Sequence, residues 1–145
     1  MSHEEVTELV SLLHRMMKLQ YGFAQRCMEK EGFHRAQPGI IMELSKCDGL
    51  TQVELASRLG VTAATISAMI KRMERAELLY RERSEEDQRL THIFLTPKGR
   101  EHSIRVKAVI TQINDVGFQD FSEEELKQTK IIFKKIIHNF EGFSN

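Results

Sequence analysis

Two short helix-forming segments separated by one glycine constrain the fold of this chain more than any other feature. Thr51-Gln52-Val53-Glu54 is a capping box, in which a hydroxyl and a carboxylate satisfy backbone amides at a helix start. Gly60 tolerates the positive φ of a helix end, and Thr62 can cap a second helix. Ala56 is small where the second helix would cross the first, and Ile66 can anchor that helix inward. The spacing therefore predicts a helix-turn-helix.

The apolar pattern changes from helical to alternating directly after this pair. Residues 79–83 and 91–95 alternate and contain β-branched and aromatic side chains, which predicts two strands. The polar stretch between them is too long for a tight turn, so we expect a hairpin with a charged tip. A hairpin in this position strengthens the helix-turn-helix prediction.

Further helices are expected on both sides of this centre. Ser2 opens a capping box before an apolar stripe that runs to about Cys27, and Pro38 suits the first position of a second helix. Thr96-Pro97 begins a long helix, and Ser122 caps a final one rich in Ile and Phe. The sequence predicts a mainly α fold with a small β-hairpin.

Composition and charge exclude several classes of protein. The 145 residues are enough for one domain, and no apolar run reaches the roughly 18 residues of a membrane span. The first residues are acidic, unlike a secretory signal, so we expect a cytoplasmic protein with no membrane partner. Basic and acidic residues balance at 21 each, but segment 51–105 holds 10 basic and 8 acidic residues. Attraction to a polyanion must therefore come from local clustering.

The helix that begins at Thr62 presents an outward face that suits a DNA major groove. Its small side chains let the helix enter the groove, its hydroxyls can bond base edges, and its later lysine and arginines suit phosphates. At the hairpin tip, the Asp87 carboxylate can hold the Arg89 guanidinium extended toward a minor groove. The alternative for the helix is an ordinary solvated face, and the alternative for Asp87 and Arg89 is a solvent-exposed ion pair without a DNA partner. The predicted DNA contacts are Thr51, Gln52, Thr62, Ala63, Ala64, Thr65, Ser67, Ala68, Lys71, Arg72, Arg75, Asp87 and Arg89.

The stretch from Thr51 to Gly99 resembles the winged helix-turn-helix of the multiple-antibiotic-resistance regulator (MarR) family. It reads TQVELASRLGVTAATISAMIKRMERAELLYRERSEEDQRLTHIFLTPKG, with a D-x-R in the hairpin at 87–89 and Leu-Thr-x-x-Gly at 95–99. The family usually has a glycine where this chain has Glu77, so the end of that helix is expected to differ.

The resemblance implies a two-fold dimer whose recognition helices enter successive major grooves while the hairpin wings reach the minor groove. It divides the single domain 1–145 into dimerisation helices in 1–34 and 101–145 and a winged helix-turn-helix lobe in 35–100. It also implies a small aromatic or anionic ligand between the dimerisation helices and the lobe. The candidate ligand-binding residues are Arg15, Lys18, Tyr21 and Arg35.

No cofactor, metal or catalytic site is expected. The histidines are scattered, and we find no Ser/His/Asp order, glycine-rich phosphate loop or paired buried carboxylates. Cys27 and Cys47 are expected to be buried or half-buried, and Cys27 lies too late in its helix to be activated by a helix N-terminus.

We expect a dimeric transcription regulator that binds a pseudo-palindromic operator and is released by a small ligand. One alternative is a winged helix that binds proteins and has no DNA affinity. The other is a regulator that responds to thiol oxidation or to a metal.

Overall fold

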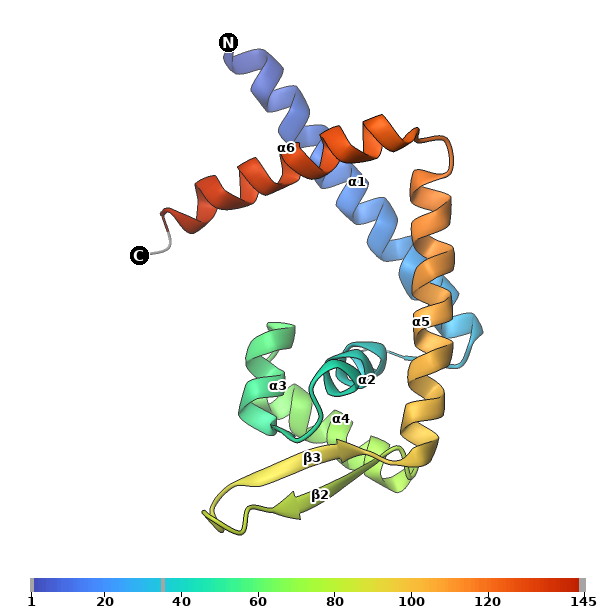
Figure 1. Ribbon diagram of the computed structural model, residues 1–145, viewed down its shortest axis with the longest axis vertical. Coiled ribbons are helices and arrows are strands. Elements are labelled where there is room, and N and C mark those ends of the chain that lie inside the picture. Colours follow the sequence, from blue (N-terminus) through green and yellow to red (C-terminus); the bar gives the residue numbers. More distant parts are fainter. Residues whose placement is uncertain (1, 35, 144–145) are drawn as a thin grey trace. The chain divides into compact units, whose positions relative to one another are not determined.

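The computed structural model describes residues 2–34 and 36–143, and its elements follow the predicted order (Figure 1). The helices are α1 (His3–Lys30), α2 (Gln37–Lys46), α3 (Gln52–Leu59), α4 (Ala63–Arg75), α5 (Pro97–Phe118) and α6 (Glu123–Glu141). The strands are β1 (Leu50–Thr51), β2 (Leu79–Arg83) and β3 (Thr91–Leu95). The mainly α fold with a small hairpin is confirmed.

The chain forms two compact units, one up to Ile113 and one from Asn114 onward. The first unit contains α1 to α4, the sheet and most of α5, whereas the second contains the end of α5 and all of α6. The division into dimerisation helices and a winged helix-turn-helix lobe concerns an assembly of two chains and stays a prediction.

The helix starts follow the local signals in the sequence. The capping boxes at Ser2, Thr51 and Ser122 all form. The Thr51 amide and hydroxyl donate to one carboxylate oxygen of Glu54 at 2.7 and 2.9 Å, and Ser122 binds Glu125 in the same way. These hydrogen bonds hold the pKa of Glu54 and of Glu125 below the usual range of a glutamate, and the bond from the backbone amide has the larger effect. The boxes at Thr51 and Ser122 therefore stabilise their helices most with the carboxylates of Glu54 and Glu125 ionised.

The core of the first unit contains the inward face of α4. Ile66, Met69, Ile70 and Met73 recur at helical spacing along one side of α4, and all four are buried. The side chains with the least exposure come from α2, α3, α4, β3 and α5 and from the turn after α4: Ile40, Ile41, Leu44, Leu55, Ile66, Ile70, Leu78, Ile93 and Val106. Because these residues form one cluster, α4 is fixed in rotation as well as in position.

The sheet has one strand more than the sequence predicted. The strand order is β1-β3-β2, and both pairings are antiparallel. In β1, Leu50 pairs with Ile93 and Thr51 pairs with His92. The His92 Nδ1 atom also lies 2.7 Å from the Gly49 carbonyl oxygen. The hairpin is therefore joined to the residue that caps α3.

The helices α1 and α6 have no buried residue in the described parts of the chain. Their apolar side chains are largely solvent-exposed, for example Leu9 on α1 at 65% and Ile132 on α6 at 54%. In the described ranges, no single helix is long and apolar enough to cross a membrane, and α3 and α4 meet that test only as a pair bent by 115°. Exposed apolar faces of this kind are typical of interaction surfaces.

Three helices end in a residue with left-handed backbone geometry. Gly32 follows α1 with φ +83°, Gly60 follows α3 with φ +63°, and Glu77 follows α4 with φ +59°. The end of α4 was expected to differ because a glutamate replaces the usual glycine. It instead has the geometry that a glycine would adopt, imposed on a side chain that disfavours it.

Two backbone hydrogen bonds close the end of α4 and explain why Glu77 accepts this geometry. The Glu77 amide donates to the Glu74 carbonyl and the Leu78 amide donates to the Met73 carbonyl, each at 2.9 Å. This pair of bonds is the Schellman motif. Leu78 is buried in the same core cluster as Met73. To bring Leu78 back to this core directly after the helix, the chain reverses through a left-handed residue at position 77, as in other Schellman motifs.

Replacing Glu77 by glycine should stabilise the protein. The expected gain is about 1 kcal/mol in the free energy of unfolding, because glycine adopts a left-handed conformation without steric cost. Urea denaturation monitored by circular dichroism measures the change. Ala76→Gly is the matched control, since φ is −83° at the neighbouring position. Glycine there should destabilise by about 0.5–1 kcal/mol. A loss of stability in Glu77→Gly would contradict the strain inferred at this turn.

Candidate nucleic-acid interface

The exposed face of α4 carries the residues predicted to read DNA. Ala64, Ala68, Lys71 and Arg75 are exposed, and Ser67 is half-buried. Thr62, Ala63, Thr65 and Arg72 are exposed as well. The face has small side chains in its first two turns and cationic ones in its last two, as the sequence predicted. Such a surface has the shape and charge to enter a major groove.

The threonines at the start of α4 are engaged with each other. The Thr62 hydroxyl accepts from the Thr65 amide at 3.2 Å, and the two hydroxyl oxygens lie 2.9 Å apart. These hydrogen bonds cap the helix, so the hydroxyls are less available to bases than the sequence suggested. At the start of α3, the Thr51 amide donates to Glu54 rather than lying free for a phosphate. Thr51 and Gln52 are half-buried.

An ion pair joins α4 to strand β2 of the wing. The Arg81 Nε atom lies 2.8 Å from a carboxylate oxygen of Glu74, and both side chains are about one-third exposed, at 33% and 30%. Arg81 belongs to β2 and Glu74 to the last turn of α4. Sequence reasoning missed this contact, because seven residues and a helix end separate the partners.

The contact between Asp87 and Arg89 differs from the expected one. The Asp87 carboxylate accepts from the Arg89 backbone amide at 3.0 Å, and no ion pair links the two side chains in the described residues. The Asp87 amide in turn donates to the Ser84 hydroxyl at 3.2 Å. Asp87 therefore shapes the loop that carries Arg89, and the expected grip on the guanidinium is wrong. Both side chains are exposed.

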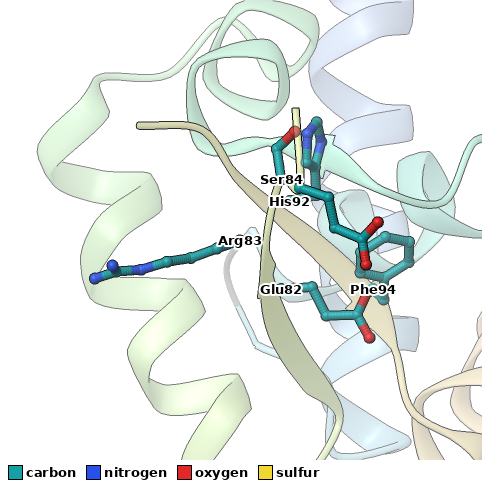
Figure 2. A pocket seen from close by; sticks show the side chains of 6 residues that line it. Glu82, Arg83, Ser84, His92 and Phe94 are labelled. Atoms are coloured by element: carbon teal, nitrogen blue, oxygen red, sulfur yellow. The ribbon is translucent and has the colours of Figure 1, made fainter. Parts of the chain in front are cut away.

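The two faces of the wing differ in charge. A cavity of about 480 Å³ on the wing is lined by Glu82, Arg83, Ser84, Glu85, His92 and Phe94. Figure 2 shows Arg83 pointing away from the other labelled side chains. Side chains alternate along a strand, so Arg83 lies on the same face of β2 as Arg81, which contacts α4. Arg83 thus adds a second cation to the face of β2 that contacts α4. The sequence prediction did not include Arg83, although its spacing of two residues from Arg81 in a predicted strand indicates that they share a face.

Comparison with known proteins decides the family. The sequence model of the MarR family matches residues 31–90. The HTH-type transcriptional regulator TcaR of Staphylococcus aureus is 31% identical over 111 residues, which cover 75% of this chain and 73% of TcaR. The chain belongs to the MarR family. The HTH-type transcriptional regulator MgrA of the same species is 33% identical over 88 residues. These residues cover 61% of this chain and 58% of the length of MgrA.

Solved structures of MarR proteins share the fold. A MarR family protein from Bacillus stearothermophilus superimposes with a TM-score of 0.85 at 22% identity, over 97% of this chain and 99% of that one. Wild-type MarR of E. coli in its apo form superimposes with a TM-score of 0.78 at 18% identity, and the match covers 88% of this chain and 95% of that one. The winged helix predicted for this MarR chain is therefore confirmed.

The predicted ligand-binding residues are not gathered around a described cavity. Arg15, Lys18 and Tyr21 are exposed on α1, and Arg35 lies outside the described residues. The wing cavity contains none of them. Their role in this MarR protein stays a prediction.

One of the two cysteines departs from expectation. Cys27 is half-buried as predicted, but Cys47 is exposed, because it follows the last residue of α2 where the chain leaves the core. In the described ranges, no three His, Cys, Asp or Glu side chains are placed to hold a metal. His102 has a buried Nδ1 atom with no hydrogen-bond partner among the described residues, and burial lowers the pKa of its imidazole.

The backbone role of Asp87 can be separated from a charge role by two substitutions. Asp87→Asn keeps an oxygen that accepts from the Arg89 amide, so amide exchange of Arg89 measured by NMR should stay close to the wild type. Asp87→Ala removes the acceptor and should speed that exchange by about tenfold, the loss of one net hydrogen bond. If Asp87→Asn behaves like Asp87→Ala, the negative charge rather than the hydrogen bond orders the tip.

Proposed function

We propose that this chain is a transcription regulator that binds a pseudo-palindromic operator as a homodimer and has no enzymatic activity. The observation that carries the proposal is the exposed face of α4, which is small at its start and cationic at its end. A rigid helix with this surface reads base edges with its first turns and contacts phosphates with its last turns. The family relatives named as transcriptional regulators support the same function.

The wing adds phosphate and minor-groove contacts in this proposal. Arg89 is exposed at the tip, and Arg83 is exposed on the face of β2 that contacts α4. Arginine suits a narrow minor groove because the negative potential is concentrated there. Recognition by α4 would therefore be sequence-specific, whereas the contribution of the wing would depend mainly on groove shape and charge.

Two copies of the chain would bring two recognition helices to one operator. The apolar faces of α1 and α6 are exposed in the single chain, and their burial would stabilise a dimer. A dimer of this kind binds half-sites about one helical turn apart, roughly 34 Å along the DNA. The symmetry of the operator would follow from the symmetry of the dimer.

Release by a small aromatic or anionic ligand completes the proposal, and it is supported by the family. Arg15, Lys18 and Tyr21 offer two cations and an aromatic ring on one exposed helix. A dimer partner could enclose these side chains and form a site that the single chain lacks.

Substitutions in α4 and in the wing should weaken DNA binding differently. The test uses DNA selected from a random pool by the wild-type protein. Ala64→Glu should abolish specific binding through bulk and charge, and the matched variant Ala64→Ser should retain it. Arg89→Ala should cost about 1–3 kcal/mol on specific and non-specific DNA alike and reduce the salt slope by about one, whereas Arg89→Lys should keep the slope.

Binding across a salt series also separates the proposal from its main rival. A winged helix that binds only proteins would select no DNA sequence from the pool. Unchanged affinity and slope in Arg89→Ala, with loss of binding in Ala64→Glu, would remove the wing from the interface and leave the recognition helix in place.

Dimerisation through α6 should depend on its apolar face. Ile136→Glu places a charge on that face and should convert the dimer to a monomer in sedimentation equilibrium, with specific DNA affinity lost at the same time. Lys134→Glu is the matched control, since it changes the polar side of the same helix turn. A fully dimeric Ile136→Glu protein would show that α6 does not hold the dimer.

A further inference from the structure

The first turn of α5 binds the backbone at the end of the recognition helix. Three successive carbonyl oxygens follow α4, and each accepts a hydrogen bond from Lys98 in this turn or from Thr96 just before it. The Lys98 ammonium donates to Ala76 at 2.8 Å, the Thr96 hydroxyl to Glu77 at 2.6 Å, and the Thr96 amide to Leu78 at 3.1 Å. A carbonyl at a helix C-terminus lacks a partner within its own helix, and the Lys98 ammonium supplies one to Ala76, the C-cap of α4. The bond between Thr96 and Leu78 continues the pairing of β2 with β3 by one residue.

Gly99 allows the two segments to approach this closely. A Cβ atom at position 99 would lie 2.1 Å from the Leu78 carbonyl oxygen and 3.0 Å from a methyl of Leu95. The Gly99 amide donates to the Thr96 hydroxyl at 3.0 Å, which places the same hydroxyl in the cap of α5 and in the bond to Glu77. The Leu-Thr-x-x-Gly motif at 95–99 is therefore a contact surface for the end of α4.

The start of α5 is held from the other side as well. Asp48, after α2, accepts from the Leu95 amide at 3.0 Å and forms an ion pair with Arg100. A rotation of α4 relative to α5 would break hydrogen bonds on one side or strain the contacts on the other. These contacts consequently fix the start of α5 against the end of α4 within the first unit.

We propose that Thr96, Lys98 and Gly99 act as positioning residues: they fix the angle between α4 and α5 and thereby set the half-site spacing that a dimer accepts. The inference rests on the proposed function, because half-sites have meaning only for a dimer on DNA. None of the three residues needs to touch a base. Their effect on specificity is transmitted through the orientation of α4.

The physical reason is geometric. One inserted base pair separates two half-sites by about 3.4 Å and rotates one relative to the other by about 34°. A dimer in which the contact between α4 and α5, here called the joint, is rigid must distort the DNA to bind such a site. If the joint is loosened, the recognition helices of the dimer can reorient. Inserting a base pair then lowers the affinity less than it does for the wild type. The affinity for the natural site also falls somewhat, because the loosened dimer is less preorganised.

The experiment measures a ratio of two dissociation constants. One DNA carries the operator selected by the wild-type protein, and the other has one base pair inserted between its half-sites. For the wild type, the insertion should raise the dissociation constant by at least about tenfold, a change in the range of one mismatched base pair. In Lys98→Met this ratio should fall to less than half of the wild-type value.

Matched variants separate positioning from stability and charge. Lys107→Met removes an equivalent exposed lysine from the same helix and should leave the ratio unchanged. Thr96→Val removes the hydroxyl at nearly constant shape and should lower the ratio, whereas Thr96→Ser should restore it. Partial unfolding or the loss of a phosphate contact weakens binding to both DNAs equally and does not alter the ratio.

Two outcomes would overturn the inference, and they are distinguishable. If Lys98→Met and Thr96→Val bind DNA with the wild-type ratio, the joint does not set the spacing, and the proposed function is untouched. If the wild-type protein selects no DNA, the proposed function fails and takes this inference with it. Faster exchange of the Thr96 amide in Lys98→Met, measured without DNA, is the supporting result expected for the joint itself.

Discussion

The burial of one face of α4 is the constraint on which the rest of the winged helix, from α2 to β3, depends. Ile66, Ile70 and Met73 pack in one core with residues of α2 and β3, so the rotation of α4 about its axis is fixed. Helical geometry then directs Ala64 and Lys71 outward, since they lie on the side of the helix opposite Ile66, Ile70 and Met73. The choice of which side chains of α4 face a partner is thus a direct consequence of core packing.

Most of the fold could be predicted because its signals are local. A capping box such as Thr51 to Glu54 spans four residues, and the strands 79–83 and 91–95 alternate within themselves, so each pattern is complete without tertiary information. The strand β1 could not be predicted. Its two residues carry no alternation, and they are extended because the edge of β3 supplies hydrogen-bond partners.

The candidate site divides in the same way. The exposed face of α4 follows from helix periodicity and was predicted. The Asp87–Arg89 contact was assigned to the wrong atoms, because a spacing of two residues does not distinguish a side-chain partner from the backbone amide that Asp87 binds. The ion pair between Glu74 and Arg81 arises only after the chain reverses beyond α4, so no periodic pattern contains it.

The arrangement of acidic groups explains how a chain with no net charge can present a cationic surface. Glu74 lies in the recognition helix, but its carboxylate is paired with Arg81. Glu54 lies at the start of α3, where hydrogen bonds from Thr51 occupy its carboxylate. Glu82 belongs to the wing, but strand alternation directs it to the face opposite Arg83. These three carboxylates are therefore neutralised by a partner, engaged in a cap or turned away, whereas Lys71 and Arg75 stay exposed. Local geometry, rather than composition, sets the sign of the potential at the recognition helix.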